Sequence, residues 1–90
     1  MNFSWDERKA ASNLRKHGIS FDEAATVFAD PLALYIEDAV DPGRTLLLGA
    51  SVRNRLLLVV HAELDERTIR IVSARRATSH ERRRYEEEGH

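Results

Sequence analysis

The chain has 90 residues, which is room for a single domain spanning 1–90, and its net charge is −1. It contains no cysteine, which excludes a disulfide framework and a thiolate zinc site. The longest unbroken apolar run, residues 56–60, is far too short to span a membrane, and the N-terminus lacks the pattern of a signal peptide. We therefore expect a cytoplasmic protein that makes no membrane contact.

The charges are distributed unevenly along the chain. Residues 1–42 hold four basic and eight acidic side chains, whereas residues 43–90 hold ten basic and seven acidic ones. Twelve of the fourteen cations are arginine. A basic second half favours either a local phosphate-binding face or a surface for an acidic protein partner.

The first 31 residues predict a short edge strand at 1–5 and then two helices. Asp6 is a suitable N-cap for a helix that runs to about residue 17, and Gly18 is placed to end it. Ser20 and Glu23 have the spacing of a capping box, which opens a second helix to about residue 29. Proline at position 31 disfavours helix in the residue before it and so ends this segment.

The remaining chain predicts four strands and a final helix. The strands are expected at 32–37, 45–52, 56–64 and 68–75, with Gly49 as a bulge. Short turns join them, so neighbouring strands should pair antiparallel. Thr78 and Glu81 form a second capping box, which opens a helix through about residue 88. The expected fold is α+β, an antiparallel sheet packed against two N-terminal helices and one C-terminal helix.

The motifs restrict the chemistry that the chain can perform. The four histidines share no metal-ligand spacing, and there is no glycine-rich phosphate loop, so we expect no metal and no cofactor. Arginine, lysine and histidine can still cleave RNA. A base accepts the proton of the ribose 2′-hydroxyl, cations stabilise the charge on the phosphorane, and an acid protonates the departing 5′ oxygen.

Lys16 and His17 offer a cation and an imidazole at a helix end, although favourable interaction with the helix dipole explains them equally well. Glu23 and Glu81 fill capping-box positions, which favours a structural role for both carboxylates. His61 lies in the most apolar strand, where it is either a core histidine or an acid–base group.

Arginines supply the candidate phosphate ligands. Arg44 begins a strand after a Pro-Gly turn, and it either joins a phosphate site or is a solvated edge charge. Arg75 and Arg76 end the last strand, where alternation directs them to opposite faces, so one of them should face a substrate. Tyr85 either contacts a base or packs on the sheet.

At this point the sequence resembles the BrnT toxin family. The resemblance runs from residue 3 to residue 85 in the family's order. It rests on Phe3-Ser4-Trp5-Asp6, Lys9-Ala10, Asn13, Lys16-His17-Gly18, Ser20-Phe21-Asp22-Glu23-Ala24, Val27-Phe28-Ala29-Asp30-Pro31, Arg44, Gly49, Arg70-Ile71-Val72-Ser73-Ala74-Arg75-Arg76-Ala77, Glu81-Arg82 and Tyr85.

This resemblance implies a RelE-like fold and an endoribonuclease toxin of a type II toxin–antitoxin system that arrests translation. It implies a BrnA-type ribbon-helix-helix antitoxin, a 2:2 complex that binds operator DNA through the antitoxin, and an RNA substrate that is either ribosome-associated or free. It also favours functional roles for Lys16, His17, Arg44, Arg75 and Arg76. The chain departs from the family where a turn glycine is expected, because it has Arg53-Asn54-Arg55 there, which either changes only the turn or adds substrate contacts from Arg53 and Arg55.

A non-catalytic module is the alternative: it would bind RNA or the ribosome, or act as a co-repressor with its antitoxin. The two N-terminal helices resemble a helix-turn-helix only superficially. The second one begins with Asp22 and Glu23 and carries no basic residue to meet DNA.

Overall fold

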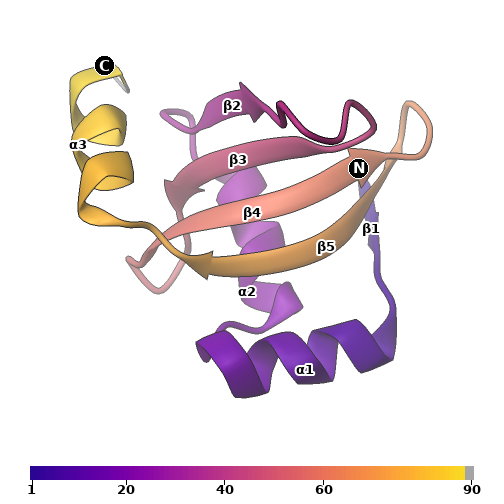
Figure 1. Ribbon diagram of the computed structural model, residues 1–90. Helices are drawn as coiled ribbons and strands as arrows, with labels where there is room; N and C mark the ends of the chain where they lie inside the picture. The colour runs from indigo at the N-terminus through magenta and orange to yellow at the C-terminus, as the bar shows by residue number, and fades with distance from the viewer. Residues whose placement is uncertain (89–90) are drawn as a thin grey trace.

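Five strands form one sheet in the order β1-β5-β4-β3-β2 in the computed structural model, which describes residues 1–88 (Figure 1). The strands are β1 (Asn2–Ser4), β2 (Leu34–Glu37), β3 (Thr45–Ala50), β4 (Leu56–Glu63) and β5 (Thr68–Arg76). The helices are α1 (Glu7–His17), α2 (Phe21–Thr26) with the short 3-10 helix η1 (Val27–Ala29), and α3 (Ser79–Glu88). The predicted α+β class and the three helices are confirmed.

The prediction of a purely antiparallel sheet is wrong at one edge. β1 pairs parallel with β5, with Phe3 opposite Ile69, so the sheet is mixed. The rule that short turns give antiparallel pairs holds for β2 to β5. It does not apply to β1, because no turn joins β1 to its neighbour and the two strands are more than sixty residues apart in the sequence.

Local signals set the helix ends. The Asp6 carboxylate accepts hydrogen bonds from the N–H groups of Arg8 (2.8 Å) and Lys9 (3.2 Å), and Gly18 ends α1 with φ = 70°. The Ser20 hydroxyl accepts from Glu23 N–H at 3.0 Å, so the second helix is capped as predicted. The carboxylate of Glu23 does not complete a capping box, because it binds other side chains instead.

The capping box at the start of α3 is complete. Glu81 N–H donates to the Thr78 hydroxyl at 3.2 Å, and Thr78 N–H donates back to the Glu81 carboxylate at 2.8 Å. The predicted tight turn before β4 is also present, with Asn54 at φ = 59°. These features depend only on residues close in sequence, which is why the sequence predicts them.

The two faces of the sheet are covered unequally. α1, α2 and η1 cover one face and enclose the main core, made by Ile19, Phe21, Ala24, Val27, Leu47, Leu57, Val59, Ile71 and Ala74. α3 meets the other face, where Tyr85 and Ala77 pack on Leu48, Leu56 and Leu58. Figure 1 shows α3 beside the end of β3 and the start of β4, so helix covers only part of this face.

Gly49 is not a bulge, because the β3–β4 ladder runs through it without interruption. The neighbouring side chains leave no room for a larger residue, because a Cβ at this position would lie 2.8 Å from the Ala33 Cβ and 2.9 Å from Val27 Cγ1. The irregularity lies between β4 and β5, where Val60 pairs with Ser73 but His61 pairs with Ile71. β5 therefore has one extra residue at Val72, which shifts its alternation.

Among residues 1–88, no helix has the length and apolar character needed to cross a membrane.

Candidate active site

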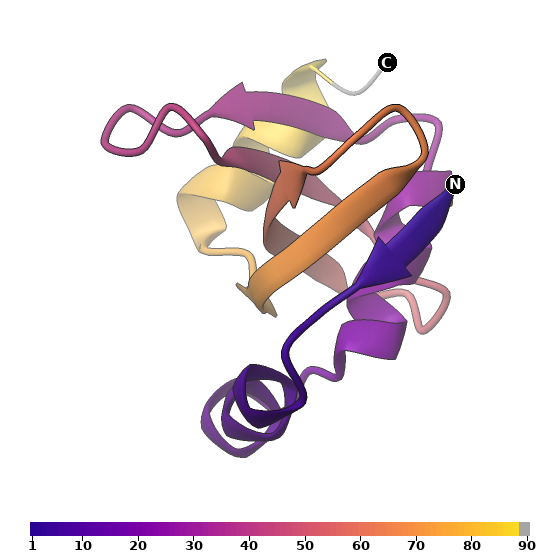
Figure 2. The same ribbon diagram turned by 90° about the vertical axis from the view of Figure 1, so that its right-hand side faces the viewer.

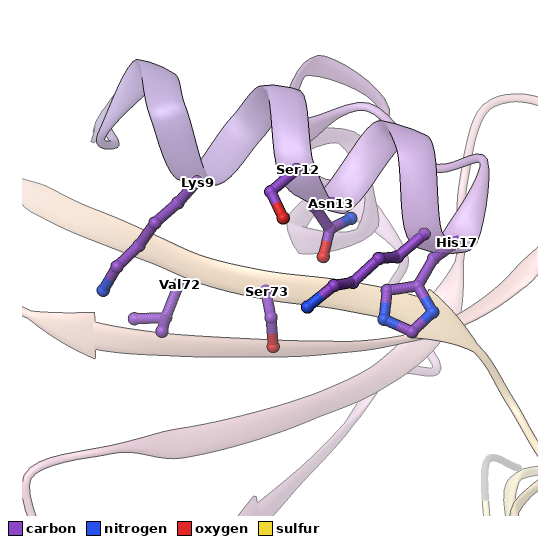
Figure 3. Close-up of a pocket in the computed structure, with 7 residues that line it drawn as sticks. Lys9, Ser12, Asn13, His17, Val72 and Ser73 are labelled. Atoms are coloured by element: carbon purple, nitrogen blue, oxygen red, sulfur yellow. The ribbon is translucent and has the colours of Figure 1, made fainter.

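A shallow groove of about 190 Å³ runs between α1 and β5 (Figure 3). β1 pairs with β5 only as far as Arg70, so the outer edge of β5 beyond that point faces α1 and no strand. The groove residues of α1 are spaced at three, four, seven and eight positions, which places them on one helix face. The lining consists of Lys9, Ser12, Asn13, Lys16 and His17 from α1 and Val72 and Ser73 from β5.

Asn13 fixes α1 onto the strand. Its side-chain amide donates to the Ala74 carbonyl at 2.8 Å and to the Ile19 carbonyl at 2.9 Å, and its carbonyl oxygen accepts from Ala74 N–H at 3.0 Å. The side chain is only 6% exposed, so it satisfies backbone groups that would otherwise be buried without partners. The residues one turn later, Lys16 and His17, are consequently held over β5.

The chemistry of the groove is cationic and polar. Lys9 and Lys16 supply ammonium groups, His17 supplies an imidazole, and the two serines supply hydroxyls. In the described residues, no carboxylate lines the groove. Figure 3 shows the Lys9 side chain extending toward β5 and the His17 ring at the other end of the same helix face. Such a surface can bind a phosphate and exchange a proton with an oxygen bound to it.

The structure separates Arg75 from this groove. Arg75 forms a bidentate ion pair with Glu81, with N–O distances of 2.8 and 2.9 Å, on the side of the sheet where α3 lies. The pair lowers the pKa of the Glu81 carboxyl from its usual range. Arg76 is exposed and alternates with Arg75, so it shares a face with Ala74, the face that α1 covers. The predicted split of the two arginines between opposite faces is confirmed.

Two other predicted catalytic residues are placed away from the groove. Arg44 lies at the β2–β3 turn, where it pairs with Asp41 at 3.3 Å in a separate hollow. His61 is 0% exposed, and its ring packs against Phe28 and Tyr35. Burial lowers the pKa of His61, which favours the neutral ring. His61 therefore occupies the position of a core histidine, which is one of the two alternatives that the sequence left open.

The predicted substrate-binding residues are dispersed. Arg53 is exposed in the turn before β4. Arg55 binds the Glu23 carboxylate through Nε at 2.9 Å and also through Nη2, and its donors are directed inward. The Tyr85 hydroxyl donates to the Asp30 carboxylate at 2.6 Å, and burial together with this bond raises the pKa of Tyr85 to about 12.

Three groove residues, Lys9, Ser12 and Ser73, were not predicted as site residues from the sequence. The signal for the first two was present, because Lys9 and Ser12 lie seven and four residues before Lys16 and so share its helix face. Ser73 gave no such signal, since its place in the groove depends on the extra residue in β5.

Fold and groove together define a small α+β protein with a cationic, carboxylate-free groove suited to a phosphate-bearing substrate. Comparison with known families makes this specific. Residues 5–81 match the family described as "Ribonuclease toxin, BrnT, of type II toxin-antitoxin system". The chain belongs to this BrnT family of ribonuclease toxins, as the resemblance in its sequence had indicated.

A solved structure agrees with this assignment at the level of fold. The 1.1 Å crystal structure of the Brucella abortus ribonuclease toxin BrnT superposes with a TM-score of 0.73 and 21% sequence identity, covering 88% of this chain and 99% of the Brucella chain. A search of curated proteins gives no match.

Proposed function

We propose that this toxin cleaves RNA endonucleolytically without a metal, in the groove between α1 and β5, and so arrests translation. The observation that carries the proposal is the joint placement of Lys9, Lys16 and His17 on one helix face above the free edge of β5. The family establishes a ribonuclease toxin, and the groove offers the charges and the proton carrier that such a reaction needs.

The proposed reaction is an internal transesterification. The ribose 2′-oxygen bonds to the neighbouring phosphorus as it loses its proton, and the bond from phosphorus to the 5′ oxygen breaks as that oxygen gains one. The ammonium groups of Lys9 and Lys16 stabilise the negative charge on the phosphorane. His17 exchanges a proton with the reacting oxygens, and the products are a 2′,3′-cyclic phosphate and a free 5′-hydroxyl.

Other predicted residues take different roles in this proposal. Arg76 is exposed on the face that α1 covers, and we assign it to a phosphate that flanks the cleaved bond. Arg75 holds α3 through Glu81. Arg44 and His61 are not part of the proposed groove.

We further infer a RelE-like relationship for the single domain, a cytoplasmic site of action where translated RNA is found, and neutralisation by a BrnA-type antitoxin in a 2:2 complex. An antitoxin partner and an RNA substrate are implied by the type II family itself. The antitoxin type, its stoichiometry and action on ribosome-bound RNA follow from the family resemblance.

Translation arrest tests the proposal. Wild type, Lys16→Ala and His17→Ala are induced in a bacterium, and incorporation of radiolabelled amino acid is followed over time. Arg15→Ala is the matched control, because Arg15 is exposed on α1 but does not line the groove. We expect arrest by wild type and control but continued incorporation with Lys16→Ala and with His17→Ala, because loss of the proton carrier should lower the RNA cleavage rate roughly 100-fold or more. Arrest by both groove variants would contradict the proposed site.

The reaction class is tested with purified protein and a synthetic RNA in excess EDTA. Cyclic phosphate ends produced under these conditions agree with the proposal. Cleavage that requires added divalent metal contradicts the metal-independent step. RNA binding with intact RNA ends supports the non-catalytic alternative. The observation that favours this alternative is that, among residues 1–88, His17 supplies the one imidazole that lines the groove.

A further inference from the structure

α1 borders a second groove on its other flank, with a volume of about 290 Å³. Four α1 residues at helical spacing line it, together with Trp5, which directly follows β1, and the start of α2. Figure 2, which looks almost along α1, shows the helix standing out from the sheet at the lower edge of the molecule. The lining residues are Trp5, Glu7, Ala10, Ala11, Leu14, Ser20, Phe21 and Asp22.

The floor of this groove is apolar. Phe21 is buried at its base, and the Trp5 ring packs edge-on against it with centroids 5.9 Å apart. Leu14 is 51% exposed, which is a large apolar surface for a position facing a groove. Burying this surface under a partner would be favourable, because apolar area removed from water lowers the free energy.

The rim of the groove is acidic. Glu7 of α1 and Asp22 of α2 are exposed carboxylates that line the groove, and no cation lines it within residues 1–88. Carboxylates repel RNA phosphates, so this flank of α1 does not extend the cationic groove on the other flank. A cationic protein segment is the complementary ligand.

We propose that this acid-rimmed groove is the docking site for the neutralising antitoxin, and that the antitoxin inserts an apolar side chain flanked by lysine or arginine. The apolar side chain contacts Trp5 and Leu14, while the flanking cations pair with Glu7 and Asp22. The inference rests on the proposed function, because it takes the antitoxin to be the partner that stops RNA cleavage.

The position of the groove explains how docking neutralises the toxin. Lys9, Lys16 and His17 lie on one flank of α1, and Glu7 and Leu14 lie on the other. A helix with its side chains is only about 10 Å across, so a protein bound to one flank crowds the other. RNA is thereby kept out of the cationic groove without any contact between the antitoxin and His17.

Binding of a purified BrnA-type antitoxin that neutralises this toxin tests the proposal. Trp5 is the only tryptophan in the chain, so its emission and its quenching by acrylamide report directly on the groove when a tryptophan-free antitoxin variant is used. We expect binding to protect Trp5 from quenching. For Glu7→Gln with Asp22→Asn, we expect antitoxin affinity to fall roughly tenfold or more and its salt dependence to weaken.

Matched variants separate docking from folding and from catalysis. Leu14→Gln should weaken antitoxin binding, whereas Leu64→Gln, at a similarly exposed leucine in the β4–β5 turn, should not. Glu86→Gln with Glu87→Gln, on exposed positions of α3, is the charge control. The groove variants should still cleave RNA, and in cells they should escape neutralisation.

Two results would overturn the docking site. The first is unchanged antitoxin affinity in both Leu14→Gln and the Glu7→Gln, Asp22→Asn double variant. The second is Trp5 fluorescence that changes when RNA binds but not when the antitoxin binds. If the wild type failed to arrest translation, the proposed function would be contradicted, but the affinity measurements would still test the docking site.

Discussion

Glu23 lies almost wholly inside the molecule and accepts hydrogen bonds from the Ser51 hydroxyl at 2.7 Å and from the Arg55 guanidinium. Arg55 also donates to the Gly18 carbonyl at 3.4 Å. One carboxylate thus links α2 to the β3–β4 turn, and Arg55 extends the link to the end of α1. The Arg55 and Ser51 hydrogen bonds lower the pKa of Glu23 below its usual 4.5 despite desolvation.

Replacing Glu23 with glutamine should cost about 2 to 3 kcal/mol of unfolding free energy at pH 7, because Arg55 loses its charged partner. Since the folded-state pKa is lowered, this contribution is present above pH 4.5 and is lost as the pH falls through the folded pKa. Urea unfolding of wild type and variant from pH 7 to pH 3 measures the difference. A gap that stays constant down to pH 3 would contradict the assignment. Glu66→Gln, at an exposed position, should change little.

At the scale of elements, side chains hold α1 and α3 to the sheet. Asn13 closes the free edge of β5 with hydrogen bonds that imitate a neighbouring strand. α3 buries no residue of its own and is attached by Arg75–Glu81 and Tyr85–Asp30. α1 is therefore held by the buried Asn13 amide, by the packing of Ala10 on the core and by the Arg55 bond to Gly18, whereas α3 is held by two polar contacts and the packing of Tyr85.

Asn13→Ala should destabilise the fold by about 2 to 4 kcal/mol, because the Ala74 N–H and carbonyl would lose their buried partners. Ser12→Ala, at the adjacent partly exposed position, should change the unfolding free energy by less than about 0.5 kcal/mol. Denaturant unfolding followed by circular dichroism compares the two variants. Equal stabilities would show that Asn13 does not hold the helix on the strand.

Tyr85→Phe should cost about 1 to 2 kcal/mol, because Asp30 loses a partly buried hydroxyl donor. The raised pKa of Tyr85 means that its contribution is complete below pH 10 and is lost as the pH approaches about 12. The chain has two tyrosines, so a Tyr35→Phe variant leaves Tyr85 as the only phenol to titrate by absorbance. Ionisation of the folded variant near pH 10 would contradict the bond to Asp30.

For the whole molecule, the net charge is −1 and the proposed RNA contacts are confined to one groove and to Arg76. Binding to a polyanion must then rest on a few local cations. The groove on the other flank of α1 is acidic and repels nucleic acid, so the charge differs between the two flanks of this helix. The protein should accordingly bind RNA in one orientation.

Lys9→Gln with Lys16→Gln should reduce the slope of log affinity for single-stranded RNA against log salt concentration by about 1.4, at roughly 0.7 per lost phosphate contact. Fluorescence anisotropy of a labelled RNA between low and physiological salt measures this slope. Arg82→Gln with Arg83→Gln, on exposed positions of α3, removes the same charge elsewhere. An equal loss of slope in both double variants would mean that the groove is not the phosphate site.

Local sequence signals were sufficient to predict the helices, most of the strand pairing and the family. The caps at Asp6, Ser20 and Thr78 and the left-handed residues Gly18 and Asn54 act within a few residues, so the helices and turns followed from local chemistry. Lys16 and His17, which line the groove, were predicted as candidates from their place at a helix end. Their neighbours Lys9 and Ser12 were within reach of the same helical spacing.

Features that depend on contacts between distant residues could not be predicted in this way. The parallel pairing of β1 joins segments far apart in the chain, and the extra residue at Val72 is defined by the register with β4, so neither has a local signal. The ion pairs of Arg55 with Glu23 and of Arg75 with Glu81 also have no local signal, and neither does the burial of His61. A side chain's type states what chemistry it can perform, but its partners are chosen by packing between elements, and those contacts decide whether it remains free to act.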